Sequence, residues 1–253
     1  MAILANTEFG ILRLTLSRPQ KRNSINSEMF DMLTSTLVAA AKDESVRVVL
    51  LEGGEEIFSA GVDLEQVSKN PEEVDRAAEA FFEELKNFSK PIVARVNGPA
   101  VGAAFAMLMY CDMVYASEKA LFSIPAIALA RTPRFGTIPL MCASAGHPRA
   151  AEKLLLSEPI TAQEAYDMHL ITAFFDDETL NNAVAAKVAR LAVLPPGAVQ
   201  ASKTLLRHAR ELRLQGFASA ERSIYEAQVI SGEAHEALDA FLTGRKPVFN
   251  KSE

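Results

Sequence analysis

Apolar and polar positions follow two different rhythms in the first part of the chain. Residues 10–17 (GILRLTLS) alternate between the two kinds, and the β-branched segment 46–51 (VRVVLL) runs up to a Gly-Gly pair, so both predict strands. Between them, over residues 29–40, apolar positions recur at helical spacing, with Asn26 or Ser27 as the predicted cap. A strand, a helix and a strand in this order predict a crossover unit.

The same order repeats in the next part of the chain. Residues 74–88 carry one apolar helical face, and Pro91 leads into a predicted strand at 92–96. A helix rich in small residues, roughly 100–110, then leads into a strand at 112–116. Two successive crossover units with buried strands predict a mainly parallel core sheet, and therefore an α/β fold.

Beyond residue 150 the pattern becomes almost purely helical. A helix is predicted at 151–156, and Thr161 with Glu164 matches a capping box. A Pro-Pro-Gly break at 195–197 divides the predicted core, residues 1–194, from a C-terminal helical region, residues 195–253, with helices at 198–208, 212–231 and 233–242. We expect this region to pack on a neighbouring subunit, and the pattern equally allows helices that close their own core.

Composition narrows the class of protein. With 253 residues, 49% of them hydrophobic, the chain can bury one large core. Its 26 Lys and Arg against 32 Asp and Glu give a formal charge of −6, which provides no basic footprint for nucleic acid or an anionic membrane. Its 2 cysteines lack metal-like spacing, so we expect no disulfide framework and no metal site. No leader-like or membrane-spanning stretch is present, and we expect a cytoplasmic location.

Four stretches and the C-terminal tail form an ordered series of motifs. They are 16–26 (LSRPQKRNSIN), 58–64 (FSAGVDL), 90–102 (KPIVARVNGPAVG), the run from Cys111-Asp112 to 122, and 240–249 (AFLTGRKPVF). Together these motifs cover nearly the whole chain. Their order and spacing resemble those of the crotonase (enoyl-CoA hydratase/isomerase) superfamily. Residues 97–102 (NGPAVG) and 194–198 (LPPGA) are most similar to its Δ3,Δ2-enoyl-CoA isomerase branch.

The resemblance implies a fold, an assembly and a ligand. The fold is a crotonase-like spiral of ββα turns with a C-terminal helical trimerisation region, assembled as a homotrimer or homohexamer. The ligand is an acyl-CoA thioester, which is the substrate, with no separate cofactor. Two backbone N–H groups, here those of Val62 and Ala103, hold the oxygen of a thioester enolate. Backbone amides can do so whatever their side chains, and Gly61 and Gly102 allow tight turns at this point.

The resemblance also assigns residues to coenzyme A. Lys21, Arg22 and the backbone of Ser24 and Ile25 match the segment that lines the CoA adenine and phosphates, and two cations suit an anionic ligand. Phe241 matches a tail residue that reaches CoA from a neighbouring subunit, although the basic residue expected three positions later is a glycine here. The other expected ligand contacts lie in the two glycine motifs, at Ala60, Gly61, Val62, Asp63, Leu64 and Gly102.

The carboxylates that the family uses for proton transfer are missing. Hydrating an enoyl thioester needs a base and an acid, and the two matching positions are Ala106 and Ala126. An isomerase needs one carboxylate, in a Pro-Glu-Gly turn that reads Pro133-Arg134-Phe135 here. Arginine stays protonated near neutral pH, so Arg134 cannot be a base, but it can pair with an acidic substrate group or a buried carboxylate.

A substitute base would have to come from another element. The candidates are Tyr110 and three glutamates on the helix that borders the acyl pocket in this family, Glu79, Glu83 and Glu84. Acidic residues opposite an apolar helical face are usually solvated, and Tyr110 fits a core position equally well.

Other ionisable residues are interpreted as structural. Asp63 and Asp112 lie inside the motifs but are typical of turn-capping aspartates, and the four histidines match no catalytic position of the family. Three functions stay open: an enzyme that forms a thioester enolate, a catalytically silent acyl-CoA-binding oligomer, and a divergent lyase or hydrolase in which Arg134 holds a substrate carboxylate. A titratable group within reach of the thioester α-carbon distinguishes the first two.

Overall fold

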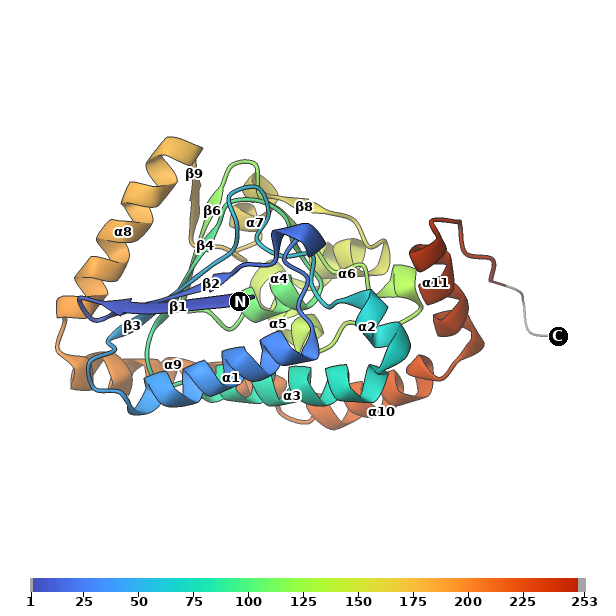
Figure 1. Ribbon diagram of the computed structural model, residues 1–253, viewed down its shortest axis with the longest axis horizontal. Coiled ribbons are helices and arrows are strands. Elements are labelled where there is room, and N and C mark those ends of the chain that lie inside the picture. The colour runs from blue at the N-terminus through green and yellow to red at the C-terminus, as the bar shows by residue number, and fades with distance from the viewer. Residues whose placement is uncertain (1, 250–253) are drawn as a thin grey trace.

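The computed structural model describes residues 2–249 and is built around a six-stranded sheet (Figure 1). Its strands follow the order β1 (Ile3–Glu8), β2 (Ile11–Leu16), β3 (Val48–Glu52), β4 (Ile92–Val96), β6 (Met113–Ser117) and β9 (Ala173–Phe175). β1 runs antiparallel to β2, and every later neighbour is parallel, which confirms the predicted α/β fold. The pattern did not predict β1, because this edge strand buries only Ile3 and has no alternation.

A second, three-stranded sheet modifies the prediction for residues 100–110. It joins β5 (Ala100–Val101), β7 (Leu121–Ser123) and β8 (Ile160–Thr161). The predicted helix is therefore shorter, α4 (Ala103–Leu108), because its first two residues pair with β7 and Gly102 then turns the chain. The consequence is that α4 begins directly after this sheet, where its first N–H groups have no partner within the helix.

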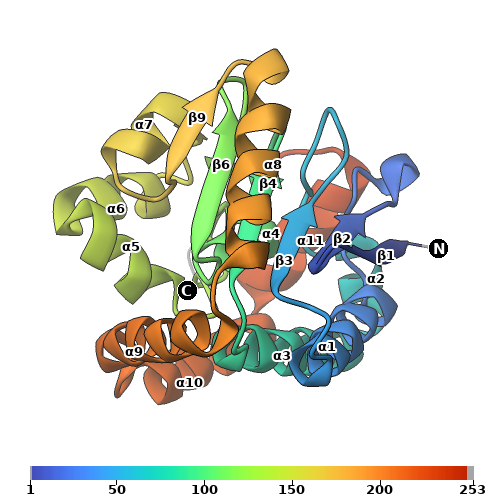
Figure 2. The ribbon, with the colours of Figure 1, turned by 90° about the vertical axis from the view of Figure 1, so that its left-hand side faces the viewer.

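Helices cover both faces of the large sheet. α8 (Asp177–Val193) packs on one face, over Val48 and Leu50 of β3, as Figure 2 shows. α1 (Ser27–Lys42), α3 (Pro71–Asn87) and α4 pack on the other, against Val49 and Leu51. Because both faces are covered, β3 and β4 are apolar except for Glu52 and Arg95, which form an ion pair, and such apolar strands are expected of a parallel sheet in a three-layer fold.

Local capping fixes several helix ends where the sequence predicted them. The Asn26 side chain accepts a hydrogen bond from the Met29 N–H at the start of α1, and Thr161 with Glu164 forms a complete capping box. The remaining helices before residue 195 are η1 (Pro19–Lys21), α2 (Leu64–Lys69), η2 (Ile127–Leu129), α5 (Thr137–Ala145), α6 (His147–Leu155) and α7 (Ala162–Asp167).

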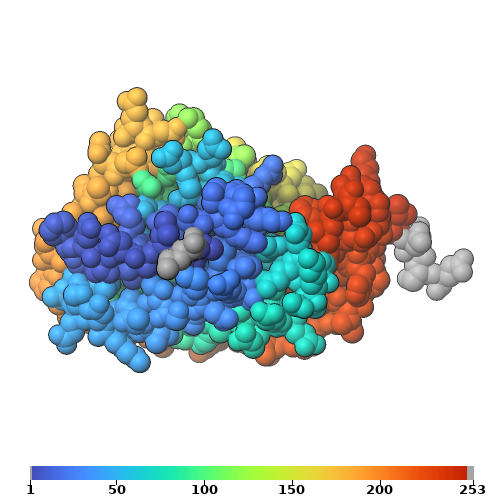
Figure 3. Space-filling view, viewed as in Figure 1, coloured from blue at the N-terminus to red at the C-terminus, as the bar shows by residue number. Residues whose placement is uncertain are grey.

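The C-terminal region consists of α9 (Pro196–Leu214), α10 (Phe217–Val229) and α11 (Gly232–Thr243). α11 is close to its predicted bounds, whereas α9 ends later and α10 begins later than the predicted 198–208 and 212–231. The buried Lys203 anchors α9, since its Nζ donates to the Asp112 carboxylate at 2.8 Å and to the Lys90 carbonyl. α11 stands at one end of the molecule beside α2 (Figure 3). Among residues 2–249, no helix has the length and apolar character needed to cross a membrane.

Candidate active site

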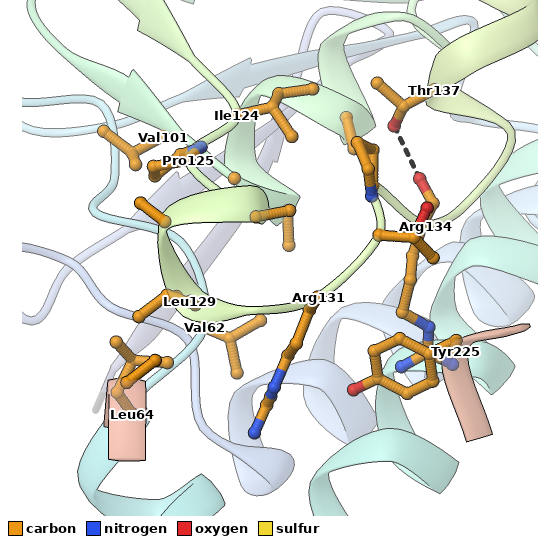
Figure 4. A pocket seen from close by; sticks show the side chains of 18 of the residues that line it. Val62, Leu64, Val101, Ile124, Pro125, Leu129, Arg131, Arg134, Thr137 and Tyr225 are labelled. Carbon is orange, nitrogen blue, oxygen red and sulfur yellow. Dashed lines mark hydrogen bonds between the residues drawn. The ribbon is translucent and has the colours of Figure 1, made fainter. Parts of the chain in front are cut away.

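A cavity of about 460 Å³, called the main cavity here, is walled by the two glycine motifs, the loop after η2 and the last two helices. Its wall is largely apolar and comes from segments far apart in the sequence (Figure 4). This volume and this kind of wall are typical of small-molecule sites. The predicted site residues that line it are Ala60, Val62, Leu64, Gly102, Ala103, Arg134 and Phe241.

Among the backbone N–H groups of this wall that have no acceptor among residues 2–249 are those of Val62 and Ala103. Gly61 brings them together: a Cβ built at Gly61 would lie 2.5 Å from the Val101 carbonyl oxygen and 3.5 Å from the Ala103 nitrogen. The turn at Gly61 therefore packs directly against the start of α4. Unpaired N–H groups held close together in an apolar wall are suited to binding an oxyanion.

Backbone conformation explains the second glycine. Gly102 has φ 57° and ψ −121°, a combination that residues with a side chain rarely adopt. A Cβ at this position would meet no atom within 4 Å, so the conformation and not crowding requires glycine. This turn ends β5, and Ala103, which lines the cavity, then begins α4.

Ile25 holds the Val62 backbone in place. The Ile25 N–H donates to the Gly61 carbonyl at 2.7 Å, and the Asp63 N–H donates to the Ile25 carbonyl at 2.9 Å. Val62 lies between these two hydrogen bonds, so its N–H has a fixed direction without being used by the bridge. The buried Ile25 thus holds Val62 through its backbone, whereas the resemblance assigned its backbone to coenzyme A.

The segment predicted to contact the CoA phosphates lies beside the main cavity and not in its wall. The Lys21 Nζ is 2.6 Å from the Glu65 carboxylate, while Arg22 is exposed and Ser24 is half-buried. The Arg22 carbonyl accepts a hydrogen bond from the Ala60 N–H at 3.0 Å, which ties this segment to the cavity edge.

Asp63 is a helix cap, as the sequence interpretation held, and does not line the cavity although it was also placed among the ligand contacts. Its carboxylate accepts from the Glu65 and Gln66 N–H groups at the start of α2, and Arg18 Nη1 lies 2.6 Å away. Burial alone would raise the pKa of Asp63, but these hydrogen bonds outweigh it and the pKa is lowered. Its neighbour Leu64 is the residue of α2 that lines the wall.

Ala106 and Ala126, the two alanines that the resemblance aligns with catalytic glutamates, both line the main cavity. Ala106 is on α4, one turn after the Ala103 N–H, and Ala126 follows Ile124 and Pro125 before η2. The cavity is therefore apolar at both positions, and neither can transfer a proton.

Arg134 is bound by two carboxylates of α3. Its Nη1 lies 2.7 Å from Asp75 and its Nη2 2.7 Å from Glu79, and its side chain is only 14% exposed. The guanidinium also stacks on the Tyr225 ring, 3.9 Å from the centroid. Protein carboxylates, one of the two kinds of partner that the sequence allowed for Arg134, therefore bind its guanidinium.

α10 fixes the same loop from the other side. The Gln228 Oε1 accepts from the Thr132 N–H at 2.7 Å, and the Glu221 carboxylate accepts from the Phe135 and Gly136 N–H groups at 2.7 and 3.0 Å. Burial raises the pKa of Glu221, although these N–H donors oppose the shift. Two residues about two turns apart on α10 thus hold the loop that carries Arg134.

Asp75 is the residue that sequence reasoning missed. It is the one carboxylate among the residues that line the main cavity, and the Tyr225 hydroxyl donates to its Oδ1 at 3.2 Å. It was overlooked because it lies on the polar side of an amphipathic helix. The available signal was its place one turn before Glu79, which allows both carboxylates to bind one cation.

The substitute bases considered from sequence all lie outside the main cavity. Glu79 binds Arg134 and, at 2.9 Å, Arg222, while Glu83 is exposed and Glu84 is half-buried. The Tyr110 hydroxyl donates to the Phe135 carbonyl at 2.6 Å, and burial raises the pKa of Tyr110 to about 12.

The residues interpreted as structural are also outside the cavity. The Asp112 carboxylate accepts from the Ile92 N–H at 2.7 Å and binds Lys203. The four histidines are exposed: His147, His169, His208 and His235. Within residues 2–249, no group of three or more His, Cys, Asp or Glu side chains could hold a metal ion.

The C-terminal helix closes one side of the cavity. Phe241 and Arg245 line it from α11 and the following residues of the same chain, whereas the resemblance implied a contact from a neighbouring subunit. Arg245 lies one position after Gly244, where the resemblance led us to expect a basic residue. Its two terminal nitrogens bind carboxylates, Nη1 that of Glu236 at 2.5 Å and Nη2 that of Asp239 at 2.7 Å.

Known proteins resemble this chain over nearly its whole length. The family model described as enoyl-CoA hydratase/isomerase matches residues 6–252. The 2,3-dehydroadipyl-CoA hydratase of Escherichia coli (strain K12) is 35% identical, over 98% of each chain. The human enoyl-CoA delta isomerase 2 is 32% identical over 95% of this chain, which spans 63% of that protein. A solved enoyl-CoA hydratase/isomerase from Pseudoalteromonas atlantica T6c superposes with a TM-score of 0.91 at 30% identity, over 99% of this chain and 100% of that one. The chain belongs to the enoyl-CoA hydratase/isomerase family.

Proposed function

We propose that this chain is an acyl-CoA enzyme of the hydratase/isomerase type that stabilises a thioester enolate with the N–H groups of Val62 and Ala103. The observation that carries the proposal is the pair of N–H groups without acceptors in an apolar wall. Such fixed donors each contribute about 3–4 kcal/mol when negative charge develops on an oxygen. A carbonyl oxygen placed between them becomes more negative as the enolate forms, so the site favours this step.

The residues around the cavity favour isomerisation over hydration. Hydration needs a base for water and an acid for Cα, whereas moving a double bond needs one group that takes a proton from Cα and returns it to Cγ. With alanine at positions 106 and 126, Asp75 is the group that we assign to this proton transfer. Arg134 and Tyr225 position its carboxylate. The similarity to an enoyl-CoA delta isomerase supports the same choice.

The test compares Asp75→Asn with Glu79→Gln. Both changes remove one of the two carboxylates bound to Arg134, but only Asp75 lines the cavity, so Glu79→Gln is a matched control. Conversion of 3-enoyl-CoA to 2-enoyl-CoA is followed by the absorbance of the conjugated thioester. We expect Asp75→Asn to lower kcat by about 10²–10⁴ and Glu79→Gln by no more than a few-fold.

Binding of a saturated acyl-CoA, measured by calorimetry on the same samples, makes each result interpretable. Unchanged binding with lost turnover in Asp75→Asn supports proton transfer by Asp75. An equal loss of turnover in both variants would show that Asp75 only supports Arg134. Tight binding by the unaltered protein without turnover of either enoyl-CoA would refute the enolate chemistry and leave an acyl-CoA-binding protein.

We also propose a homotrimer or homohexamer assembled through the C-terminal helices. Large apolar side chains are exposed on α9 and α10 and just after α10, including Leu205 (71%), Leu206 (67%) and Ile230 (80%), more than a monomer usually leaves in contact with water. Light scattering of the purified protein measures the assembly, and a monomer of 27.5 kDa would refute it.

A further inference from the structure

Three arginines line the main cavity, and they differ in how their charge is balanced. Arg134 binds Asp75 and Glu79, and Arg245 binds Glu236 and Asp239. Arg131, by contrast, has no carboxylate within 4.0 Å among residues 2–249. The cavity wall therefore carries one positive charge that no described residue neutralises.

The surroundings of Arg131 leave a donor unsatisfied. Its Nε is buried and has no hydrogen-bond partner among the described residues. In Figure 4 its side chain extends between the apolar Val62 and Leu64 on one side and Tyr225 on the other. A buried donor without a partner costs about 1–3 kcal/mol, and arginine cannot release its proton to avoid this. A ligand that brings an acceptor would remove this penalty.

The backbone around Arg131 is fixed before any ligand binds. The Arg131 N–H donates to the Ala126 carbonyl at 3.0 Å, and the next residue, Thr132, is held by Gln228 at 2.7 Å. Ala130 adopts the left-handed conformation, with φ 52°, that ends η2. A loop held in this way loses little backbone entropy when a ligand binds, which favours a specific contact.

A guanidinium matches the geometry of an oxyanion, and an acyl-CoA offers two sources of one. One is the set of CoA phosphates, and the other is a carboxylate on the acyl chain. Arg131 is hydrogen-bonded through its backbone to Ala126, which lines the main cavity at a position that the resemblance assigns to proton transfer. The segment 21–25 assigned to the phosphates, however, is not in this wall. The arrangement therefore places Arg131 with the acyl group.

We propose that Arg131 binds a carboxylate at the far end of the acyl chain, so that the substrates are CoA thioesters of dicarboxylic acids. This inference rests on the proposed function, because it takes the main cavity to be the acyl site. It explains why the charges of Arg134 and Arg245 are balanced within the chain while that of Arg131 is left for the ligand.

The test measures binding of saturated thioesters, so that turnover is not needed. CoA esters of four-, five- and six-carbon dicarboxylic acids are compared with the monocarboxylic esters of equal length and with free CoA. The proteins are the unaltered chain, Arg131→Met, which keeps an unbranched apolar stem, and Arg131→Lys, which keeps the charge but loses the planar fork. Circular dichroism confirms that each variant is folded.

We expect the unaltered chain to prefer the dicarboxylic ester at one or more lengths. Arg131→Met should weaken binding of that dicarboxylic ester by roughly 10- to 100-fold and change binding of the monocarboxylic ester by no more than about three-fold. Arg131→Lys should bind the dicarboxylic ester with an affinity between those of the unaltered chain and Arg131→Met. No preference at any length would overturn the inference, and equal weakening of all ligands, free CoA included, would assign Arg131 to a phosphate. Failure of every thioester to bind would instead refute the proposed function.

Discussion

Replacing Arg134 with methionine tests whether its ion pairs hold the cavity loop between α3 and α10. The Arg134 side chain is 14% exposed, its partners Asp75 and Glu79 are 30% and 37% exposed, and its guanidinium stacks on Tyr225. Breaking a fully buried pair costs about 3–5 kcal/mol and an exposed one at most about 1 kcal/mol. This half-buried pair, which also loses a cation–π contact, should lower the free energy of unfolding by about 2–3 kcal/mol.

Urea unfolding followed by circular dichroism, at one fixed protein concentration, measures this change. Arg222→Met is the matched control, because Arg222 binds the same Glu79 at 2.9 Å but is 61% exposed and should contribute less than about 1 kcal/mol. Arg134→Lys should lower the free energy of unfolding by about half as much as Arg134→Met, because lysine keeps the charge but lacks the planar guanidinium fork. Equal destabilisation by Arg134→Met and Arg222→Met would refute the argument that the buried network holds the loop.

Three further changes test other parts of the structure. Gly102→Ala should cost about 1–3 kcal/mol in urea unfolding and lower kcat at least ten-fold, because the strained turn would displace the Ala103 N–H; wild-type turnover would contradict the assigned oxyanion site. Tyr110→Phe should lower the free energy of unfolding by about 1 kcal/mol through loss of the hydrogen bond to Phe135, and turnover should stay within a few-fold, since a large loss would point to a catalytic hydroxyl. Glu221 has a raised pKa in the folded chain, so the folded state keeps its proton to higher pH than the unfolded state and stability falls as pH rises from the ordinary glutamate range through that raised pKa. In urea unfolding measured between about pH 4 and 7, Glu221→Gln should lack this fall of the free energy of unfolding with pH. The same dependence on pH in Glu221→Gln and the unaltered chain would show that Glu221 does not titrate in this range.

Much of the fold follows from local sequence patterns. The buried strands β3, β4 and β6 and the amphipathic helices α1 and α3 have periodicities that local sequence reveals, and their order requires a parallel sheet. β1 and β5 were not predicted, because a strand with one buried residue and a strand of two residues carry no periodic signal. Their pairing is set by the neighbouring strands.

The candidate site divides in the same way. Val62 and Ala103 could be placed in the cavity wall from sequence because they follow the glycines of two motifs with fixed spacing. Asp75 and Arg131 were not found, since their roles depend on which charges remain unpaired after folding, and no short segment contains that information. Local sequence also could not show that Arg134 is satisfied by α3.

The loop of residues 132–136 has a consequence for the order of folding. Arg134 is bound by Asp75 and Glu79, which precede it by 59 and 55 residues. Phe135 is bound by Glu221, which follows it by 86 residues, and Thr132 by Gln228, which follows it by 96. Contacts of such sequence separation form late, because the chain must first close long loops. A chain still being synthesised can therefore assemble its central sheet while this wall of the cavity stays open until α10 has emerged and docked. Ligand binding then reports completion of the whole fold.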